Sequence, residues 1–167
     1  LAVIVTVLLA SPFSEVYGQR SAAFVRPTSE MTALPGDEVY IPGVPLISQH
    51  PEMPNGCELV ATTMLLQYAG VAATQFDIAK VVNKTPGLSG TAGHLSGGDP
   101  YLGFVGNPTG QSGVGVYVQP LLDMIESYLP GQGIDLSGSS FDLLLQTVAS
   151  GRPVVLWTTL DFTAPHS

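Results

Sequence analysis

Residues 44–71 read VPLISQHPEMPNGCELVATTMLLQYAGV, and this stretch decides how the rest of the chain is interpreted. From Cys57 onward its apolar residues recur at i+3, i+4, i+7, i+8 and i+11, which is the spacing of one helical face. Asn55 is expected to cap this helix, with Glu58 three residues later as in a capping box. Gly70 is expected to end it. The stretch therefore predicts a loop that leads into a capped amphipathic helix.

Cys57 is the only cysteine of the chain, and capping by Asn55 would put it in the first turn of the helix. Unpaired backbone amides and the helix dipole favour an anion there, so we expect a lowered thiol pKa and a nucleophile. The alternative is a small buried hydrophobe, the commoner role of an isolated cysteine. Gln49 favours catalysis, because its amide and the Cys57 backbone amide can both donate to an oxyanion. Taken alone, Gln49 is interpreted as an ordinary polar loop residue.

The rest of the chain predicts more helices and a late strand. Residues 85–115 are rich in glycine and are expected to form a long loop that shapes a substrate cleft. Residues 152–160 are rich in β-branched residues and predict a buried strand. Helices come first and strands last, which favours an α+β fold. The further helices are expected over residues 75–84, capped by Thr74 with Asp77, over residues 119–129, and from Ser139 to Gly151.

The N-terminus resembles part of an export signal. Residues 1–10 are an apolar run with Thr6 as its one polar residue, followed by small and polar residues, as in the apolar core of a secretory signal. A buried strand or helix is the alternative, and a membrane anchor stays open because a full span needs roughly 20 apolar residues. We expect residues 1–23 to be a partial signal peptide or anchor, 24–37 a linker and 38–167 the folded domain, with residues 38–48 extended.

The composition excludes several classes of protein. Charged residues make up 11% of the 167 and the formal net charge is −8, whereas an ordinary soluble domain is about 25% charged. Binding to nucleic-acid phosphates needs a basic stripe, and only Lys80, Lys84 and Arg152 lie beyond residue 26. One cysteine cannot build a disulfide framework. No cysteine, histidine and acidic cluster has metal-ligand spacing, so we expect no metal, cofactor or nucleic-acid partner.

Three stretches carry a family resemblance, in this order: residues 44–71, residues 99–120 (DPYLGFVGNPTGQSGVGVYVQP) and residues 151–160 (GRPVVLWTTL). The chain resembles the exported branch of the bacterial double-glycine-leader (bacteriocin-processing) peptidase-like family, which is papain-like. The resemblance implies N-terminal helices, among them the nucleophile helix, packed on a C-terminal antiparallel sheet. It also implies that Cys57 is the nucleophile and that Gln49 is an oxyanion donor.

The same family places a general-base histidine, and then an orienting Asp or Asn, after the strand that matches residues 151–160. His166 is the only histidine beyond that strand. Its terminal Ala-Pro-His-Ser context favours a loop residue over the base, and the orienting acid has no candidate. His50 and His94 are interpreted as exposed. The resemblance implies that the C-terminal part of the domain and its sheet is missing, so we expect the 167-residue piece alone to be poorly soluble or inactive.

The sequence therefore predicts an exported cysteine peptidase that hydrolyses peptide bonds and is secreted or held at the cell surface. Its partner would be a peptide or protein substrate. Tyr101, Phe104 and Tyr117 could contact a peptide, although packing is their default interpretation, as it is for Trp157. Two alternatives remain open: a non-catalytic papain-like module that binds peptides or cell-wall polymers, and an acyl-transfer or isopeptidase variant. Substrate preference and oligomeric state do not follow from the sequence.

Overall fold

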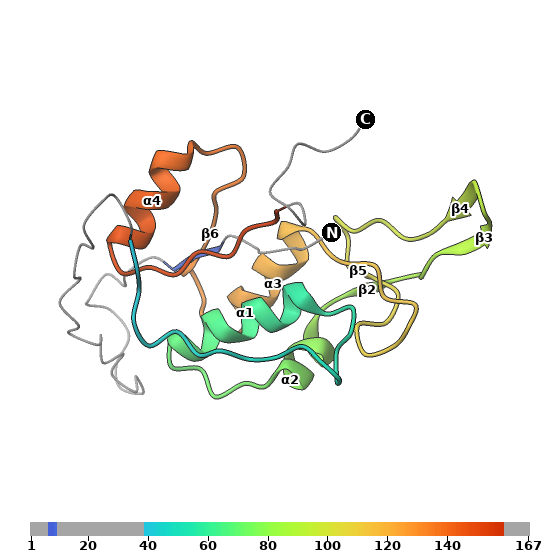
Figure 1. The fold of residues 1–167 in the computed structure, drawn as a ribbon, viewed down its shortest axis with the longest axis horizontal. Coiled ribbons are helices and arrows are strands. Elements are labelled where there is room, and N and C mark those ends of the chain that lie inside the picture. The colour runs from blue at the N-terminus through green and yellow to red at the C-terminus, as the bar shows by residue number, and fades with distance from the viewer. Residues whose placement is uncertain (1–6, 10–38, 159–167) are drawn as a thin grey trace.

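The structure, a computed structural model, describes residues 7–9 and 39–158. Within these residues the chain forms four helices and six short strands around a central α1 (Figure 1). The helices are α1 (Cys57–Tyr68), α2 (Gln75–Val81), α3 (Val118–Tyr128) and α4 (Phe141–Ala149). The strands are β1 (Val7–Leu9), β2 (Lys84–Thr85), β3 (Ser89–Thr91), β4 (His94–Ser96), β5 (Phe104–Val105) and β6 (Gly133–Asp135).

Helix α1 is the centre of the core and packs against both α2 and α3. The apolar face of α1 that begins at Cys57 is only partly buried in the core, and the most deeply buried side chains of α1 lie on another face. Thr62 and Thr63 lie on that face and are fully buried. Their hydroxyls donate to the carbonyls of Glu58 and Leu59, respectively, at 2.7 Å, so neither hydroxyl is left without a partner in the core. Bonding within the helix lets polar residues enter the core. The core around α1 contains Leu59, Val60, Leu65, Leu66, Ile78, Phe104, Leu121 and Ile125.

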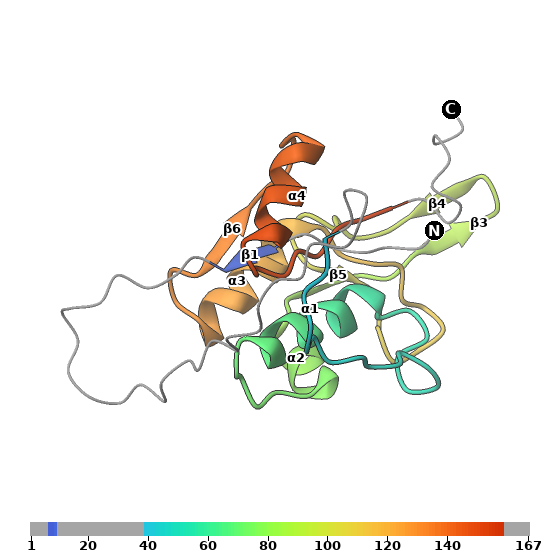
Figure 2. The same ribbon diagram turned by 60° about the vertical axis from the view of Figure 1, so that its left-hand side comes forward.

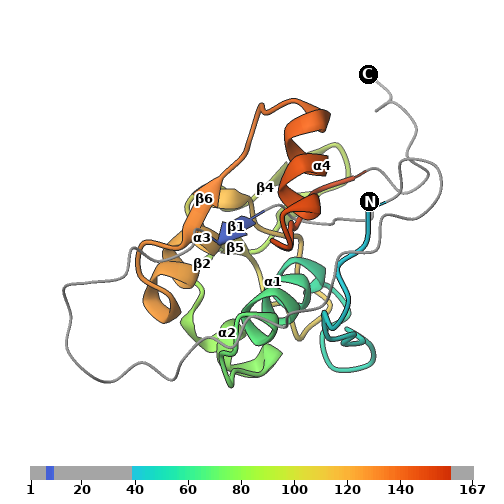
Figure 3. The ribbon, with the colours of Figure 1, turned by 90° about the vertical axis from the view of Figure 1, so that its left-hand side faces the viewer.

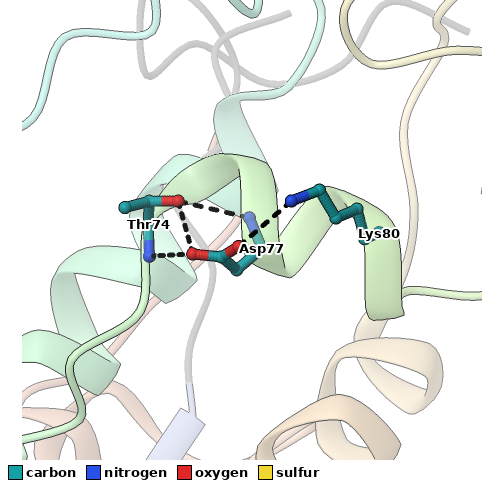
Figure 4. Close-up of polar contacts among 3 residues, drawn as sticks. All are labelled: Thr74, Asp77 and Lys80. Atoms are coloured by element: carbon teal, nitrogen blue, oxygen red, sulfur yellow. Dashed lines mark hydrogen bonds and ion pairs between the residues drawn. The ribbon is translucent and has the colours of Figure 1, made fainter.

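The end of α1 and the start of α2 follow the predictions. Gly70 adopts φ +86° just beyond α1. At α2, the Thr74 hydroxyl accepts from the Asp77 amide at 3.3 Å, and the Asp77 carboxylate accepts from the Thr74 amide at 3.1 Å (Figure 4). Lys80 adds an ion pair to Asp77 at 3.3 Å. The Thr74 hydroxyl, the Thr74 amide and Lys80 together lower the pKa of Asp77. The predicted capping box is confirmed.

The glycine-rich segment is more structured than expected. Strand β2 pairs in parallel with β5, with Lys84 opposite Phe104, so α2 ends at Val81 rather than at residue 84. Strands β3 and β4 form an antiparallel hairpin that projects away from the helices (Figures 1 and 2). These strands are only two or three residues long, which is too short for the alternating apolar pattern that marks a strand in a sequence.

Strand β1 pairs antiparallel with β6, and Figure 3 shows the two beside each other. Residues 7–9 are thus in a strand, which was the alternative interpretation of the apolar N-terminal run; the export signal stays a prediction. No helix among the described residues is long and apolar enough to span a membrane. Helix α3 begins one residue before the predicted start, with Pro120 buried in its first turn. Helix α4 is capped by the Ser140 hydroxyl, one residue later than expected.

The two segments expected to be extended form no strand in the described residues. Residues 39–48 contain a turn at Pro42 and Gly43, and residues 152–158 contain only an isolated bridge residue, Trp157. Val155 nevertheless lies in the core. The described strands form three two-stranded sheets. The mixture of helices and strands agrees with the α+β prediction, but the expected C-terminal antiparallel sheet does not appear in this part of the chain.

Candidate active site

The loop before α1 folds back on itself. The Met53 amide donates to the Gln49 carbonyl at 2.6 Å, and the Gly56 amide donates to the Met53 carbonyl at 3.0 Å. Met53 is fully buried and anchors this loop in the core. Gly56 is the N-cap of α1 and provides no side-chain cap. Cys57 is therefore the first residue of the helix, one position earlier than capping by Asn55 would have placed it.

The predicted cap of α1 is wrong. The Asn55 side chain donates to the carbonyl of Gly110 at 2.7 Å, across 55 residues of sequence, instead of accepting from the first turn. Glu58 also turns away from the helix start, and its Oε1 accepts from the Val116 amide at 3.3 Å. Both side chains meet the segment 106–116, which lies over the N-terminus of α1. A tertiary contact has replaced the local cap in both cases.

Two glycines let the segment 106–116 come this close. At Gly106 the backbone has φ +83°, and a Cβ there would lie 2.0 Å from the Ser112 carbonyl oxygen. At Gly115 a Cβ would lie 2.5 Å from Glu58 Oε1. Only glycine combines a positive φ with the absence of a Cβ. Part of the glycine-rich region therefore lies against the first turn of α1, and its role in shaping a substrate cleft stays a prediction.

The Cys57 thiol is half-buried and donates to Glu58 Oε2 at 3.4 Å. Burial, followed by the charge and hydrogen bond of Glu58, raises the pKa of Cys57 to about 11, although the amides of Glu58 and Cys57 act in the opposite direction. The expectation of a lowered thiol pKa is therefore wrong for this structure. The helix N-terminus favours the thiolate as expected, but desolvation and a neighbouring carboxylate outweigh it.

Glu58 is buried, with 2% of its surface exposed. Burial raises the pKa of this carboxyl above its ordinary range, while hydrogen bonds from its own amide, from Cys57 and from Val116 partly offset the rise. Glu58 was expected to cap the helix, and no role was predicted for Val116. The sequence offered one indication that Glu58 acts on the thiol, because Glu58 directly follows Cys57 in Gly-Cys-Glu. No local pattern marked Val116.

Gln49 lies at the start of the same loop and is half-buried. Its Nε2 donates to the carbonyl of Pro54 at 3.0 Å, which fixes the orientation of the amide group. A side-chain amide nitrogen carries two hydrogens, and this bond uses one of them. The loop thus holds the two predicted site residues, Gln49 and Cys57, at its two ends; within the described residues the Gln49 side chain bonds to Pro54 rather than to Cys57.

The remaining candidates lie away from this pair or outside the described residues. His50 and His94 are exposed, and His166 lies outside the described residues. Phe104 is fully buried in the core. Tyr117 lies between two other aromatic rings, with centroids 4.6 Å from Tyr101 and 6.3 Å from Trp157, and both tyrosines stay exposed.

Two hollows lie among the described residues, and neither is lined by Cys57 or Gln49. One of about 330 Å³ lies where α2 approaches Tyr128 of α3. The other, of about 120 Å³, lies between α1 and residues 153–155. The described residues contain no group of three or more His, Cys, Asp or Glu side chains that could hold a metal ion. The candidate chemistry therefore rests on the thiol and its neighbours rather than on the larger hollow.

The fold and this site define a mixed helix and strand domain with one thiol at the start of its central helix. A family model described as the Peptidase_C39 like family matches residues 41–167. The chain therefore belongs to this peptidase-like family, and the resemblance stated from the sequence is confirmed.

Two relatives agree with this assignment. The chain is 36% identical over 113 residues to the uncharacterized protein YvpB of Bacillus subtilis (strain 168), covering 68% of this chain and 44% of YvpB. It is also similar to a crystal structure of a protein described as C39-like from Bacillus anthracis. The TM-score is 0.57 at 37% identity, over 65% of this chain and 53% of that one. The chain thus spans about half the length of the relatives it matches.

Proposed function

We propose that this chain carries the nucleophile of a papain-like cysteine peptidase that hydrolyses peptide bonds. The observation that carries the proposal is the placement of Cys57 as the first residue of α1, at the end of a loop that begins with the oriented amide of Gln49. Membership of a peptidase-like family supports the reaction class. Peptides or proteins would be the substrates.

In the proposed reaction the Cys57 sulfur attacks the carbonyl carbon of the scissile peptide bond. A carbon–sulfur bond forms, the carbon–nitrogen bond breaks, and the thiol proton is passed to the leaving amine. Water then hydrolyses the thioester and restores the thiol. Because the pKa of Cys57 is about 11, only about 10⁻⁴ of the thiol would be ionised at pH 7. A base must therefore take the proton as attack occurs. His166 is the one histidine beyond residues 151–160 that could do so, although its sequence context favours a loop residue.

The proposed oxyanion site combines the second hydrogen of the Gln49 amide with the backbone amide of Cys57. That backbone amide belongs to the first turn of α1, where N–H groups have no partner within the helix. Donors already fixed in place stabilise the charge of a tetrahedral intermediate without reorganising during the reaction. The bond from Gln49 to the Pro54 carbonyl would supply this preorganisation.

Replacing Gln49 with alanine is expected to lower kcat about 10²- to 10³-fold and to leave KM nearly unchanged, as loss of one oxyanion donor does. Hydrolysis of a fluorogenic peptide by the full-length protein measures both. Gln119→Ala is the matched control, because this exposed glutamine also makes one side-chain hydrogen bond, to Asp123 at 2.8 Å. Equal activity of Gln49→Ala and Gln119→Ala would exclude Gln49 as an oxyanion donor.

The proposed function is tested directly by incubating the full-length protein with a mixture of peptides and with a peptidyl acyloxymethyl ketone. We expect cleaved peptides with new amino termini, and one ketone adduct on Cys57 that stops the cleavage. Mass spectrometry maps both. A protein that cleaves peptides while Cys57 stays unmodified would have a different nucleophile. A folded protein that cleaves no peptide at all would contradict the peptidase.

We also propose that the protein is exported and acts in secreted form or at the cell surface. The apolar run of residues 1–10 and the low content of charged residues support this location. A fusion of residues 1–37 to a reporter enzyme that is active only outside the cytoplasm tests it, and loss of reporter activity when Val5 is replaced by aspartate is the expected result.

The raised pKa of Cys57 favours a second candidate function, a peptide-binding module without catalysis. A thiol that stays protonated beside a buried carboxyl resembles a structural cysteine more than a resting nucleophile. The two functions differ in their products. A binding module returns every peptide intact after it dissociates, whereas a peptidase releases fragments.

A further inference from the structure

Glu58 is the only charged side chain that is buried among the described residues, and the reaction above gives it no part. We propose that Glu58 is a positioning residue, which holds the Cys57 thiol in its protonated form in the resting protein and orients it toward the segment 106–116. The importance of this restraint for catalysis rests on the proposed function. Its effect on the thiol itself does not.

The two oxygens of Glu58 hold the carboxyl group in one orientation. Oε2 accepts from the Cys57 thiol at 3.4 Å and Oε1 accepts from the Val116 amide at 3.3 Å. Gly115 leaves the space that Oε1 occupies. Since Val116 follows Gly115 directly, one short piece of backbone both makes room for the carboxyl and binds it. Glu58 thereby connects the thiol to a segment 58 residues later in the chain.

Few other charges act on this carboxyl. Cys57 is the titratable group that faces it from α1, and the segment 106–116 supplies the uncharged Val116 amide. Among the described residues, Lys80 pairs with Asp77, and no lysine, arginine or histidine pairs with Glu58. Without a cation beside it, an ionised Glu58 repels a second negative charge on the neighbouring sulfur. The pair therefore favours the neutral thiol.

Glu58 is not the base that activates Cys57. Burial raises the pKa of the carboxyl, but the pKa of the thiol is raised to about 11. A carboxylate is a much weaker base than such a thiolate, so a proton moved from the sulfur to Glu58 would return. The two hydrogen bonds of Glu58 instead restrain the position of the thiol. Glu58 keeps the thiol oriented and protonated until another group accepts the proton.

The test is the pH dependence of alkylation by iodoacetamide, measured on the full chain in the wild type and in Glu58→Gln. In the wild type we expect the alkylation rate to rise with pH. Its midpoint should lie well above the pKa of an ordinary cysteine, which is about 8.5. Glutamine keeps the shape and an acceptor for Val116, while its amide can donate to a thiolate. We expect Glu58→Gln to lower the midpoint by at least about one unit and to raise the rate at pH 7 about tenfold.

Glu52→Gln is the control, because Glu52 is an exposed glutamate five residues before Cys57. This variant should alkylate as the wild type does. An ordinary or lowered midpoint in the wild type overturns the inference without any need for a variant. So does a folded Glu58→Gln protein with an unchanged midpoint. A shifted midpoint in a protein that cleaves no peptide would keep the inference and remove the proposed function, so the two can fail separately.

Discussion

Replacing Cys57 with alanine is expected to abolish peptide hydrolysis, lowering kcat/KM by roughly 10⁴-fold or more, as loss of a nucleophile does. The thioester cannot form without the sulfur, and no second cysteine exists in the chain to replace it. The fold should persist, because Cys57 is only half-buried and its sulfur makes one weak hydrogen bond. Assays of a fluorogenic peptide with the full-length protein, together with thermal unfolding curves, measure the two effects separately.

Cys57→Ser is the matched variant for this prediction. Its hydroxyl can still donate to Glu58, so its stability should equal that of the wild type or exceed that of Cys57→Ala. Its hydrolysis should stay as low as that of Cys57→Ala, because an alcohol loses its proton far less readily than a thiol. Activity of Cys57→Ala within tenfold of the wild type would show that the sulfur takes no part in the reaction.

Replacing Gly106 with alanine is expected to destabilise the protein by about 2–5 kcal/mol. The new Cβ would lie 2.0 Å from the Ser112 carbonyl oxygen, and a positive φ alone costs an L-residue about 1–2 kcal/mol. The collision is with backbone, so no side chain can rotate to relieve it. The segment 106–116 would have to lift away from Asn55 and Glu58, with which it is hydrogen-bonded.

Gly43→Ala separates the two causes. Gly43 has the same φ of +83° as Gly106, but a Cβ there meets nothing within 4 Å. Its replacement should cost only the conformational part, about 1–2 kcal/mol. Urea denaturation of both variants gives the difference in the free energy of unfolding. Equal losses would mean that the segment 106–116 adjusts freely to the new methyl group.

The start of α2 and the end of α1 were predictable because short-range chemistry decides them. Thr74 and Asp77 satisfy each other's backbone amides within one turn, and Gly70 adopts its positive φ whatever surrounds it. Asn55 and Glu58 offered the same kind of pattern and were misassigned. Partners at Gly110 and Val116 bind them instead, and no feature within a few residues of Cys57 announces those partners.

The thiol pKa was mispredicted for a related reason. The position of Cys57 at the start of a helix was correctly expected, and a helix start by itself favours the thiolate. The raised pKa follows from burial of the thiol and from a carboxyl that was expected to cap the helix, and the segment 106–116 holds that carboxyl beside the thiol. Gln49 is different, because its contact with Pro54 lies within its own loop. The start of the helix could be predicted from the sequence, but neither the burial of the thiol nor the contact of Gln49 with Pro54 was predicted.

The hydrogen bonds that join Asn55 to Gly110 and Glu58 to Val116 also bear on the order of events during folding. They span 55 and 58 residues of chain. Contacts between residues so far apart in sequence form more slowly than a helix does. Until the segment 106–116 has docked, the Glu58 carboxyl has no Val116 amide to bind, and its restraint on the Cys57 thiol is incomplete. The partly folded chain is therefore expected to be more open to oxidation at this cysteine than the folded chain.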